Sequence, residues 1–245
     1  MLRPLAIALG FLTRLPVAAS AVAPRDLGRA VGWFPAVGAV LGALLLAAHG
    51  LVAGRLAPGL AALALVALHA AVTGGLHLDG VADVFDALGG GRGQRDRMLA
   101  ILRDSRIGAH GAVALVILLS AKLLATAEVV TRDAAWALYA SPVAARWAVV
   151  PLVIGFPYAR PDGLGKPFHG HAGRRELAAA TGIAALAIGW LGARALVPTV
   201  SAAAAALAIA LWLHRRLGGL TGDVYGAAIE AAELAFVIAA GLRPA

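Results

Sequence analysis

Long apolar stretches alternate with short polar segments along most of the chain. A helix needs roughly 20 apolar residues to cross the hydrocarbon core of a bilayer, and seven stretches approach or exceed that length. They are Val31–Gly54, Pro58–Leu76, Ala109–Val130, Ala134–Phe156, Leu177–Val197, Thr199–Leu213 and Tyr225–Leu242. The sixth is short, and Pro198 alone separates it from the fifth. The pattern therefore predicts about seven membrane-spanning helices, within a range of six to eight.

The composition supports a membrane protein and excludes a water-soluble globule. Of the 245 residues, 61% are hydrophobic and 14% are charged, whereas about 25% of a typical soluble chain is charged. The same high hydrophobicity excludes disorder, and the absence of cysteine excludes disulfides and thiolate ligands. We predict one all-α domain over residues 1–245, a polytopic helical bundle embedded in the lipid bilayer.

The distribution of positive charge predicts the orientation of the bundle. The net charge is +8, with 21 Lys and Arg residues, and basic residues are enriched in the cytoplasmic segments of membrane proteins. If all seven stretches cross and the N-terminus is cytoplasmic, most of these residues fall on the inner side. His77–Gly108 and Pro157–Glu176 then become cytoplasmic loops. Because topology explains much of the charge, we expect no nucleic-acid partner.

Three acids near the end of the second apolar stretch form a candidate metal site. Asp79, Asp83 and Asp86 have the spacing i, i+4, i+7, which places them along one stripe of a helix. Like charges on one face repel unless a cation lies among them, and Mg²⁺ joins carboxylates to substrate phosphates. The alternative is a solvated helix face paired with the arginines that follow.

The same polar segment contains candidates for proton transfer and phosphate binding. His77 precedes the acidic stripe and could act as a general base, orient a carboxylate or contact phosphate, or be an interfacial hydrogen-bonding residue. Arg103, Asp104, Ser105 and Arg106 place two guanidinium groups around an acid and a hydroxyl. Guanidinium groups match phosphate oxygens, which predicts an anionic substrate; the alternative is a pair of snorkelling interfacial arginines.

A second polar cluster begins the last apolar stretch. Thr221 and Asp223 precede Glu230 and Glu233, and the three acids share one helical face. Carboxylates inside membrane helices are energetically costly and indicate function. Asp223 is predicted on the same membrane side as Asp79, so the two acidic helix ends would form a site for Mg²⁺ and a transferring phosphoryl group.

The motifs that hold these residues resemble those of one known family. The long ones are GGLHLDGVADVFDAL at 74–88, RMLAILRDSRIGAHG at 97–111 and GGLTGDVYGAAIE at 218–230. Shorter ones are FLTRLP at 11–16, FPAVG at 34–38 and ARPDGLG at 159–165. In order and spacing they are similar to the motifs of the cobalamin synthase (adenosylcobinamide-GDP ribazoletransferase) family. The similarity extends from about residue 11 to residue 233.

The resemblance implies a metal-dependent phosphotransferase of the EC 2.7.8 type in the bacterial cytoplasmic (inner) membrane. In that family α-ribazole or its 5′-phosphate attacks the phosphoryl group attached to the corrinoid of adenosylcobinamide-GDP, and GMP leaves. This step completes the nucleotide loop in cobalamin biosynthesis. The active-site loops would face the cytoplasm. Neither a homo-oligomer nor an association with other enzymes of the pathway follows from residue spacing.

Carried onto this sequence, the resemblance assigns roles to the candidate residues. Asp79, Asp83 and Asp223 would hold Mg²⁺ against the diphosphate, and Asp86 or His77 would accept the proton of the attacking hydroxyl. The substrate-binding group is expected to comprise Arg103, Asp104, Ser105, Arg106 and Thr221.

Two other classes fit the sequence less well. The CDP-alcohol phosphotransferases use a DGxxAR…G…D…D pattern, but Asp79-Gly80-Val81-Ala82 is followed here by Asp83. A transporter or ion-coupled channel would use Glu230 and Glu233 as a relay. Transporters often contain internal repeats and broken midplane helices, and neither is evident in this sequence.

Overall fold

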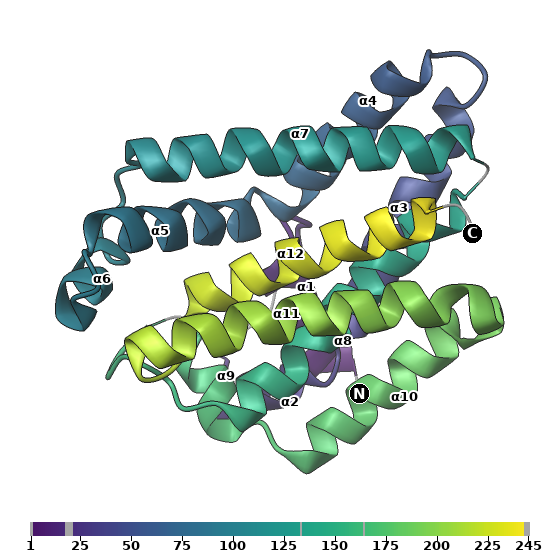
Figure 1. The fold of residues 1–245 in the computed structure, drawn as a ribbon. Helices are drawn as coiled ribbons and strands as arrows, with labels where there is room; N and C mark the ends of the chain where they lie inside the picture. Colours follow the sequence, from purple (N-terminus) through teal and green to yellow (C-terminus); the bar gives the residue numbers. More distant parts are fainter. Residues whose placement is uncertain (1, 18–21, 133, 164, 243–245) are drawn as a thin grey trace.

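The structure is a bundle in which most of the long helices lie roughly side by side (Figure 1). The computed structural model describes residues 2–17, 22–132, 134–163 and 165–242. Its helices are α1 (Leu2–Leu12), α2 (Pro24–Val31), α3 (Phe34–Val52), α4 (Pro58–Thr73), α5 (Leu76–Gly90), α6 (Arg95–Ile101), α7 (Ala109–Thr131), α8 (Trp136–Gly155), α9 (Lys166–His171), α10 (Arg174–Ile188), the 3-10 helix η1 (Gly189–Ala195), α11 (Leu196–Leu217) and α12 (Gly222–Gly241). The predicted all-α fold is confirmed.

Several helices are long and apolar enough to cross a membrane, which confirms a polytopic membrane protein. Five described segments meet this condition, and α4 with α5 makes a sixth if the bent pair counts as one span. One of the five is Arg174–Leu217, with 44 residues. A straight helix of that size would be about 66 Å long, roughly twice the hydrocarbon thickness of about 30 Å. The segment instead folds back through η1, so that α10 and α11 form a helical hairpin (Figure 1).

The position of this break corrects the expected boundary at Pro198. The backbone leaves the helical conformation at Gly192, which has φ 61° and ψ −144°. Glycine adopts positive φ without the steric cost that a side chain brings. Pro198 lies in the first turn of α11, where a missing backbone N–H breaks no helical hydrogen bond.

The predicted cytoplasmic loop 77–108 is largely helical. α4 and α5 meet at 89°, because Gly74 and Gly75 between them both adopt left-handed conformations, with φ 64° and 69°. α5 then packs against α7 and α12, burying Val81 and Val84. The second predicted loop, 157–176, contains the short helix α9. The helix α5 contains Asp79, Asp83 and Asp86, as their spacing predicted, and these acids lower the mean hydropathy along the segment.

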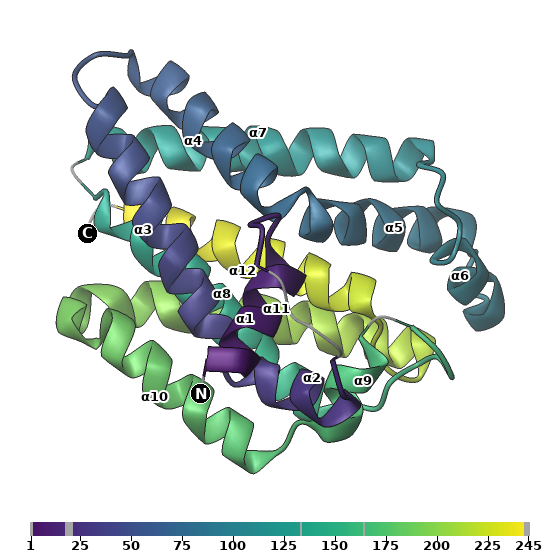
Figure 2. The ribbon, with the colours of Figure 1, turned by 180° about the vertical axis from the view of Figure 1, so that it is seen from behind.

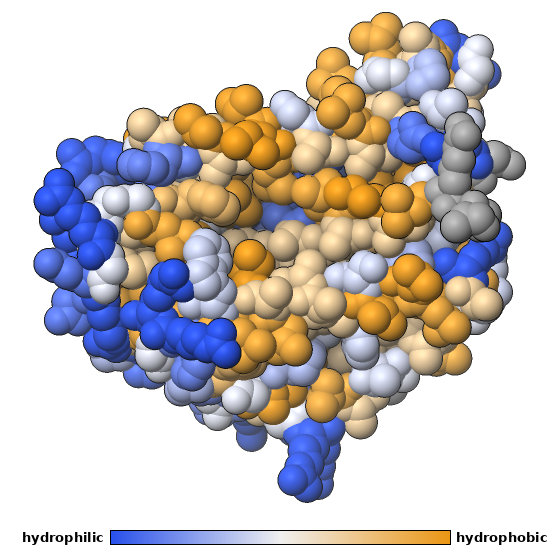
Figure 3. All heavy atoms as spheres, in the orientation of Figure 1, coloured by the Kyte–Doolittle hydropathy of each residue, from blue (hydrophilic) through white to orange (hydrophobic). Residues whose placement is uncertain are grey.

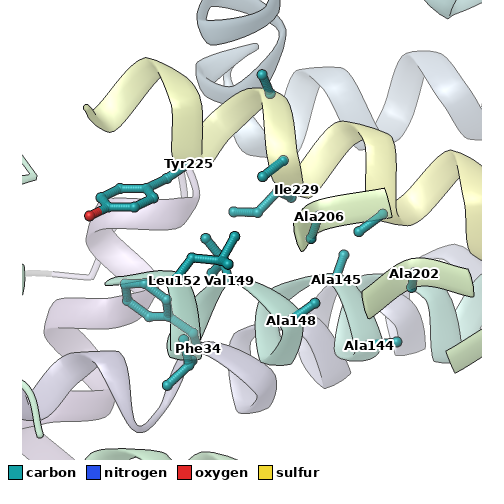
Figure 4. Packing of buried hydrophobic residues seen from close by; sticks show 14 of the residues in the cluster. Phe34, Ala144, Ala145, Ala148, Val149, Leu152, Ala202, Ala206, Tyr225 and Ile229 are labelled. Atoms are coloured by element: carbon teal, nitrogen blue, oxygen red, sulfur yellow. The ribbon is translucent and has the colours of Figure 1, made fainter. Parts of the chain in front are cut away.

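The centre of the bundle is built from small residues. Ala144, Ala145 and Ala148 of α8 lie opposite Ala202 and Ala206 of α11, with α12 beside them (Figure 4). Small side chains allow membrane helices to approach closely. The central position of α12, which packs on α5, α7, α8 and α11, makes it the helix that positions the candidate site.

The outer surface separates into an apolar belt and polar ends. Val116 and Leu124 of α7, Leu186 of α10 and Val200 of α11 are at least 66% exposed. The space-filling view shows hydrophobic residues across the middle and hydrophilic ones concentrated where α6 and the α11–α12 turn lie (Figure 3). We call this the polar end. On the opposite face, α1 and α2 lie near α9 (Figure 2).

Candidate active site

Helix α5, which contains the acidic stripe, and helix α12 pack closely at two glycines. A Cβ atom on Gly80 of α5 would lie 2.6 Å from the backbone oxygen of Asp223. A Cβ atom on Gly226 of α12 would lie 3.2 Å from the Cα atom of His77. The absence of side chains at this crossing lets the two backbones approach. As a result, the two acidic clusters of the sequence meet at one place.

A cavity of about 300 Å³ opens beside this crossing. Asp79, Asp223 and Arg160 border it together with His77. The remaining lining is mostly apolar and comes from α1, α3, α5, α8, α9, α12 and the 157–165 segment: Phe11, Leu12, Phe34, Leu76, Val149, Val153, Tyr158, Gly163, Gly165, Phe168, Gly222, Tyr225, Gly226 and Ile229. The cavity therefore combines an apolar wall with a small charged group.

Asp223 is held by an ion pair with Arg160, which the spacing of residues along the sequence does not reveal. Arg160 donates a hydrogen bond of 2.8 Å to Asp223 Oδ2, and the Arg160 side chain is 9% exposed. The Thr221 hydroxyl donates to the same oxygen at 3.1 Å and accepts from the Val224 amide at 3.4 Å. Thr221 is completely buried, so it caps α12 and does not border the cavity as a substrate-binding residue would.

Several backbone contacts bring Arg160 to the site. The Ala159 amide donates to Leu220 O and the Leu220 amide to Pro157 O, both at 2.8 Å, so the 157–165 segment is joined to the α11–α12 turn. Arg160 also donates to Leu102 O at 3.0 Å, which connects it to the end of α6. The resemblance motif at 159–165 contained Arg160, and Leu164 of that motif lies outside the described residues.

A second hollow, of about 650 Å³, lies on the other side of the start of α5. Asp79 and Asp83 border it with Arg14, which follows α1, and with Ser105. Asp79 borders both hollows and Asp223 only the first. Arg14 is exposed, and within the described residues no acidic side chain pairs with its guanidinium group. The FLTRLP motif held Arg14, but its chemistry was not inferred from the sequence.

Asp86 has a structural partner that argues against its expected role as base. Its two oxygens accept from the amides of Gly108 and Gly111, at 2.6 and 2.9 Å. These amides lie at the beginning of α7, where unpaired N–H groups and the helix dipole favour a negative charge. Asp86 is 8% exposed and borders neither hollow that contains Asp79. We conclude that Asp86 anchors α7 to α5.

The predicted basic motif lies mostly on the outer surface. Arg106 makes a bidentate pair with Asp104, with nitrogen–oxygen distances of 2.6 and 2.9 Å, and this pair lowers the pKa of Asp104 to about 2. Arg103 is also exposed. Of the four residues in the motif, Ser105 is the one that shares a hollow with Asp79 and Asp83.

The carboxylates deeper in α12 belong to a buried ion network. Lys122 of α7 donates to Glu230 at 2.6 Å and to Glu233 at 2.8 Å. Arg146 of α8, with no exposed surface, pairs with the other oxygen of Glu233. Two cations thus face two anions. The pairing explains how Glu230 and Glu233 are tolerated inside a membrane helix.

His77 lies between this network and the cavity. It is 3% exposed, and within the described residues both ring nitrogens lack a hydrogen-bond partner. An imidazole whose nitrogens are free of protein partners and which borders a cavity can exchange a proton with a ligand in it. This geometry is compatible with the predicted role of His77 in proton transfer.

The donor set suits a magnesium ion that shares its ligands with substrate. Among the described residues, no three Asp, Glu or His side chains are close enough to form a complete metal site. Mg²⁺, however, is usually held by one or two carboxylates together with water and substrate phosphates. Asp79 and Asp223, from facing helices, border the same cavity and meet that requirement.

The structure therefore defines a class, namely a polytopic helical membrane protein. Acids and guanidinium groups gather around two hollows of its bundle. Within this class the family is clear, because the family model described as cobalamin-5-phosphate synthase matches residues 4–241. The chain belongs to that family.

Curated relatives support the assignment over the full length. A protein of Pseudomonas aeruginosa strain PAO1 is 42% identical, with 98% of each chain covered. Relatives from Geotalea daltonii and Thiobacillus denitrificans are also 42% identical, over 96% and 98% of this chain and 95% and 96% of their own. All three are named adenosylcobinamide-GDP ribazoletransferase. No solved structure significantly matches the chain.

Proposed function

We propose that this protein is an adenosylcobinamide-GDP ribazoletransferase that uses Mg²⁺. The observation that carries the proposal is the convergence of Asp79, Arg160 and Asp223 at one cavity. Phosphoryl transfer requires charge stabilisation around the diphosphate and a positioned nucleophile. The full-length similarity to relatives with this name supports the same conclusion.

The polar end would face the cytoplasm of a bacterial cell. Arg92, Arg95, Arg97, Arg103, Arg106, Arg160, Arg215 and Arg216 lie in or next to the segments that form it. By the positive-inside rule this end remains on the cytoplasmic side of the inner membrane, where charged nucleotide substrates are present. The same guanidinium groups would attract such anions over a distance of about 10 Å at 0.1 M salt.

In the proposed reaction the 5′-oxygen of α-ribazole forms a bond to the phosphorus attached to the corrinoid. The bond between this phosphorus and the oxygen of the GMP portion breaks, and GMP leaves with the electron pair. The hydroxyl proton passes to a base, for which we propose His77, because it borders the cavity and neither ring nitrogen has a hydrogen-bond partner within the described residues.

The charged residues around the two hollows would hold the diphosphate. Arg160 is placed to donate to a phosphate oxygen beside Asp223, and Arg14 can do so from the second hollow. A Mg²⁺ ion held by Asp79 and Asp223, with Asp83 nearby, would neutralise charge on the diphosphate. Arg103 and Arg106 would attract the diphosphate more weakly and from a distance, because both side chains are exposed.

The transporter alternative receives no support from the described contacts. It depended on Glu230 and Glu233 as a relay, and Lys122 and Arg146 neutralise both of these carboxylates. The ion pairs among these four side chains join α7, α8 and α12 and stabilise their packing.

Purified protein in lipid nanodiscs, supplied with adenosylcobinamide-GDP, α-ribazole and Mg²⁺, is expected to release GMP and form cobalamin in equal amounts. Removal of divalent metal with EDTA should abolish GMP release, because the diphosphate then lacks its counterion, and excess Mg²⁺ should restore it. Chromatography of GMP and the corrinoid product measures both. Full turnover in EDTA would contradict the metal assignment, and absence of product in Mg²⁺ would contradict the proposed function.

Substituting Arg160 and Arg106 should show that the arginine in the cavity contributes more to kcat/KM than the arginine on the surface. Arg160→Ala is expected to lower kcat/KM about 100-fold, since a charge-assisted contact to phosphate is lost. Arg106→Ala should lower it less than tenfold, and the exposed control Arg55→Ala, in the turn between α3 and α4, should leave it unchanged. Equal losses in Arg160→Ala and Arg106→Ala would contradict the assignment. Thermal unfolding of each variant checks that the loss is not a folding defect.

A further inference from the structure

The apolar wall of the first cavity has a composition that suits one type of ligand. Phe11 and Phe168 have ring centroids 4.4 Å apart, and Phe34 lies 5.9 Å from Phe168. Tyr225 of α12 and Val149 of α8 complete this part of the wall. Figure 4 shows Tyr225, Phe34 and Val149 together at one end of the alanine-rich core. Flat aromatic ring systems pack well against such rings.

One polar group in this wall lacks a partner. Tyr225 is 8% exposed, and within the described residues its hydroxyl is buried without a hydrogen bond. Buried hydroxyl groups are normally hydrogen-bonded, because an unpaired one has lost its water. A ligand in the cavity that presents a hydrogen-bond acceptor would satisfy Tyr225.

The dimensions restrict the occupant further. Ligand cavities range from roughly 300 to 1,000 Å³, and this one, at about 300 Å³, is at the small end. A nucleoside fits such a volume, whereas a corrinoid joined to a nucleotide is far larger. The charged residues Asp79, Arg160 and Asp223 border the same cavity, so a nucleoside could place its base against the rings and its ribose among the charges.

We propose that this cavity is the binding site of the acceptor nucleoside, with its fused aromatic base between Phe34, Phe168 and Tyr225. The inference rests on the proposed function and specifies where one of its two substrates binds. The base of α-ribazole is a benzimidazole, which is largely apolar and has one unsubstituted ring nitrogen. This nitrogen accepts a hydrogen bond from the Tyr225 hydroxyl.

Asp79 lies between two hollows, and each hollow can admit one of the two substrates. Asp79, Leu76 and Phe11 border both hollows. The nucleoside occupies the first hollow, and the diphosphate substrate enters from the second, which is larger and contains Arg14 and Asp83. The start of α5 thus separates the acceptor from the donor, and the two meet at Asp79.

The wall also accounts for base selectivity. Guanine has a carbonyl and an amino group on its edge, and the rings of Phe34 and Phe168 cannot hydrogen-bond to either. Burying these polar groups of the ligand without hydrogen-bond partners costs free energy. The cavity therefore favours the benzimidazole nucleoside over the guanosine part of the other substrate.

The test uses Tyr225→Phe, which removes only the hydroxyl, and Tyr139→Phe as a matched control in α8 outside the cavity. In nanodiscs, Tyr225→Phe is expected to raise the KM for α-ribazole about tenfold, leaving the KM for adenosylcobinamide-GDP unchanged. With an analogue that carries C–H in place of the free ring nitrogen, wild type and Tyr225→Phe should have the same KM. Tyr139→Phe should behave as wild type with every substrate.

The outcomes separate this inference from the proposed function. An unchanged KM for α-ribazole in Tyr225→Phe, or a raised KM for adenosylcobinamide-GDP instead, overturns the cavity assignment and leaves the activity intact. Equal losses for α-ribazole and its C–H analogue overturn the proposed hydrogen bond. If Tyr225→Phe unfolds, Val149→Met, which narrows the cavity without adding charge, should raise the same KM. Absence of GMP release by the wild type rejects the proposed function itself.

Discussion

Replacing Asp79 with Asn is expected to reduce kcat about 100- to 1,000-fold, the range observed when one group that stabilises transition-state charge is removed. Asp79 borders both hollows and faces Asp223 from the opposing helix, so a neutral amide at this position weakens the hold on Mg²⁺ and on the diphosphate. The rate of GMP release at saturating substrates measures the effect. Because Asp79 is exposed, the variant should remain folded and inserted.

The matched control is Asp96→Asn, in α6 at the polar end. Its side chain is 95% exposed and pairs with the neighbouring Arg95, so the same chemical change there should leave kcat within about twofold. If Asp79→Asn retained full turnover, the site would have to be placed elsewhere. An increased Mg²⁺ requirement in Asp79→Asn would specifically support its role as a metal ligand.

Replacing Glu233 with Gln is expected to destabilise the protein by about 3–5 kcal/mol, the usual cost of leaving one member of a buried ion pair without its partner. Glu233 is 2% exposed and faces both Lys122 and Arg146. Without its charge, Arg146 remains buried and no other carboxylate among the described residues pairs with it, whereas Lys122 retains Glu230. Thermal or denaturant unfolding in detergent measures the change.

Two further variants test whether the loss of stability comes from the unpaired charge of Arg146. Glu128→Gln removes the carboxylate of an ion pair with Arg132 that is partly exposed, and it should cost less than about 1 kcal/mol. The double variant Glu233→Gln with Arg146→Met removes both charges and should recover part of the lost stability. No recovery in the double variant would show that the loss arises from packing rather than from an unpaired charge.

Helix positions were predictable because hydropathy and helix length are local properties. Ala109–Val130 was predicted as a span, and α7 covers Ala109–Thr131. Ala134–Phe156 corresponds to α8 at Trp136–Gly155. The helix expected for Asp79, Asp83 and Asp86 corresponds to α5 at Leu76–Gly90, which presents Asp79 and Asp83 to a hollow and an apolar face to its neighbours. A consecutive pair of glycines, Gly74-Gly75, was the available signal for its bend.

Residues of the candidate site were predictable by type, but their partners were not. Asp79 and Asp223 were expected on one side of the membrane, and the structure brings them to one cavity. Asp86 belongs to the same acidic stripe and Thr221 to the same motif as Asp223, yet their side chains bond to backbone amides at the beginnings of α7 and α12. Whether a carboxylate is free for chemistry depends on the backbone amides around it, which spacing does not reveal.

By itself, the sequence determined that this chain is a helical membrane protein of one family, because apolar runs of membrane length and long motifs are contained in consecutive residues. The tertiary structure alone decided that Arg160 pairs with Asp223, that Lys122 neutralises Glu230, and that Tyr225 faces a cavity. These partners are separated by 63 and 108 residues in the two ion pairs. Such contacts arise from close helix crossings, such as that at Gly80 and Gly226, and local pattern carries no information about which helices cross.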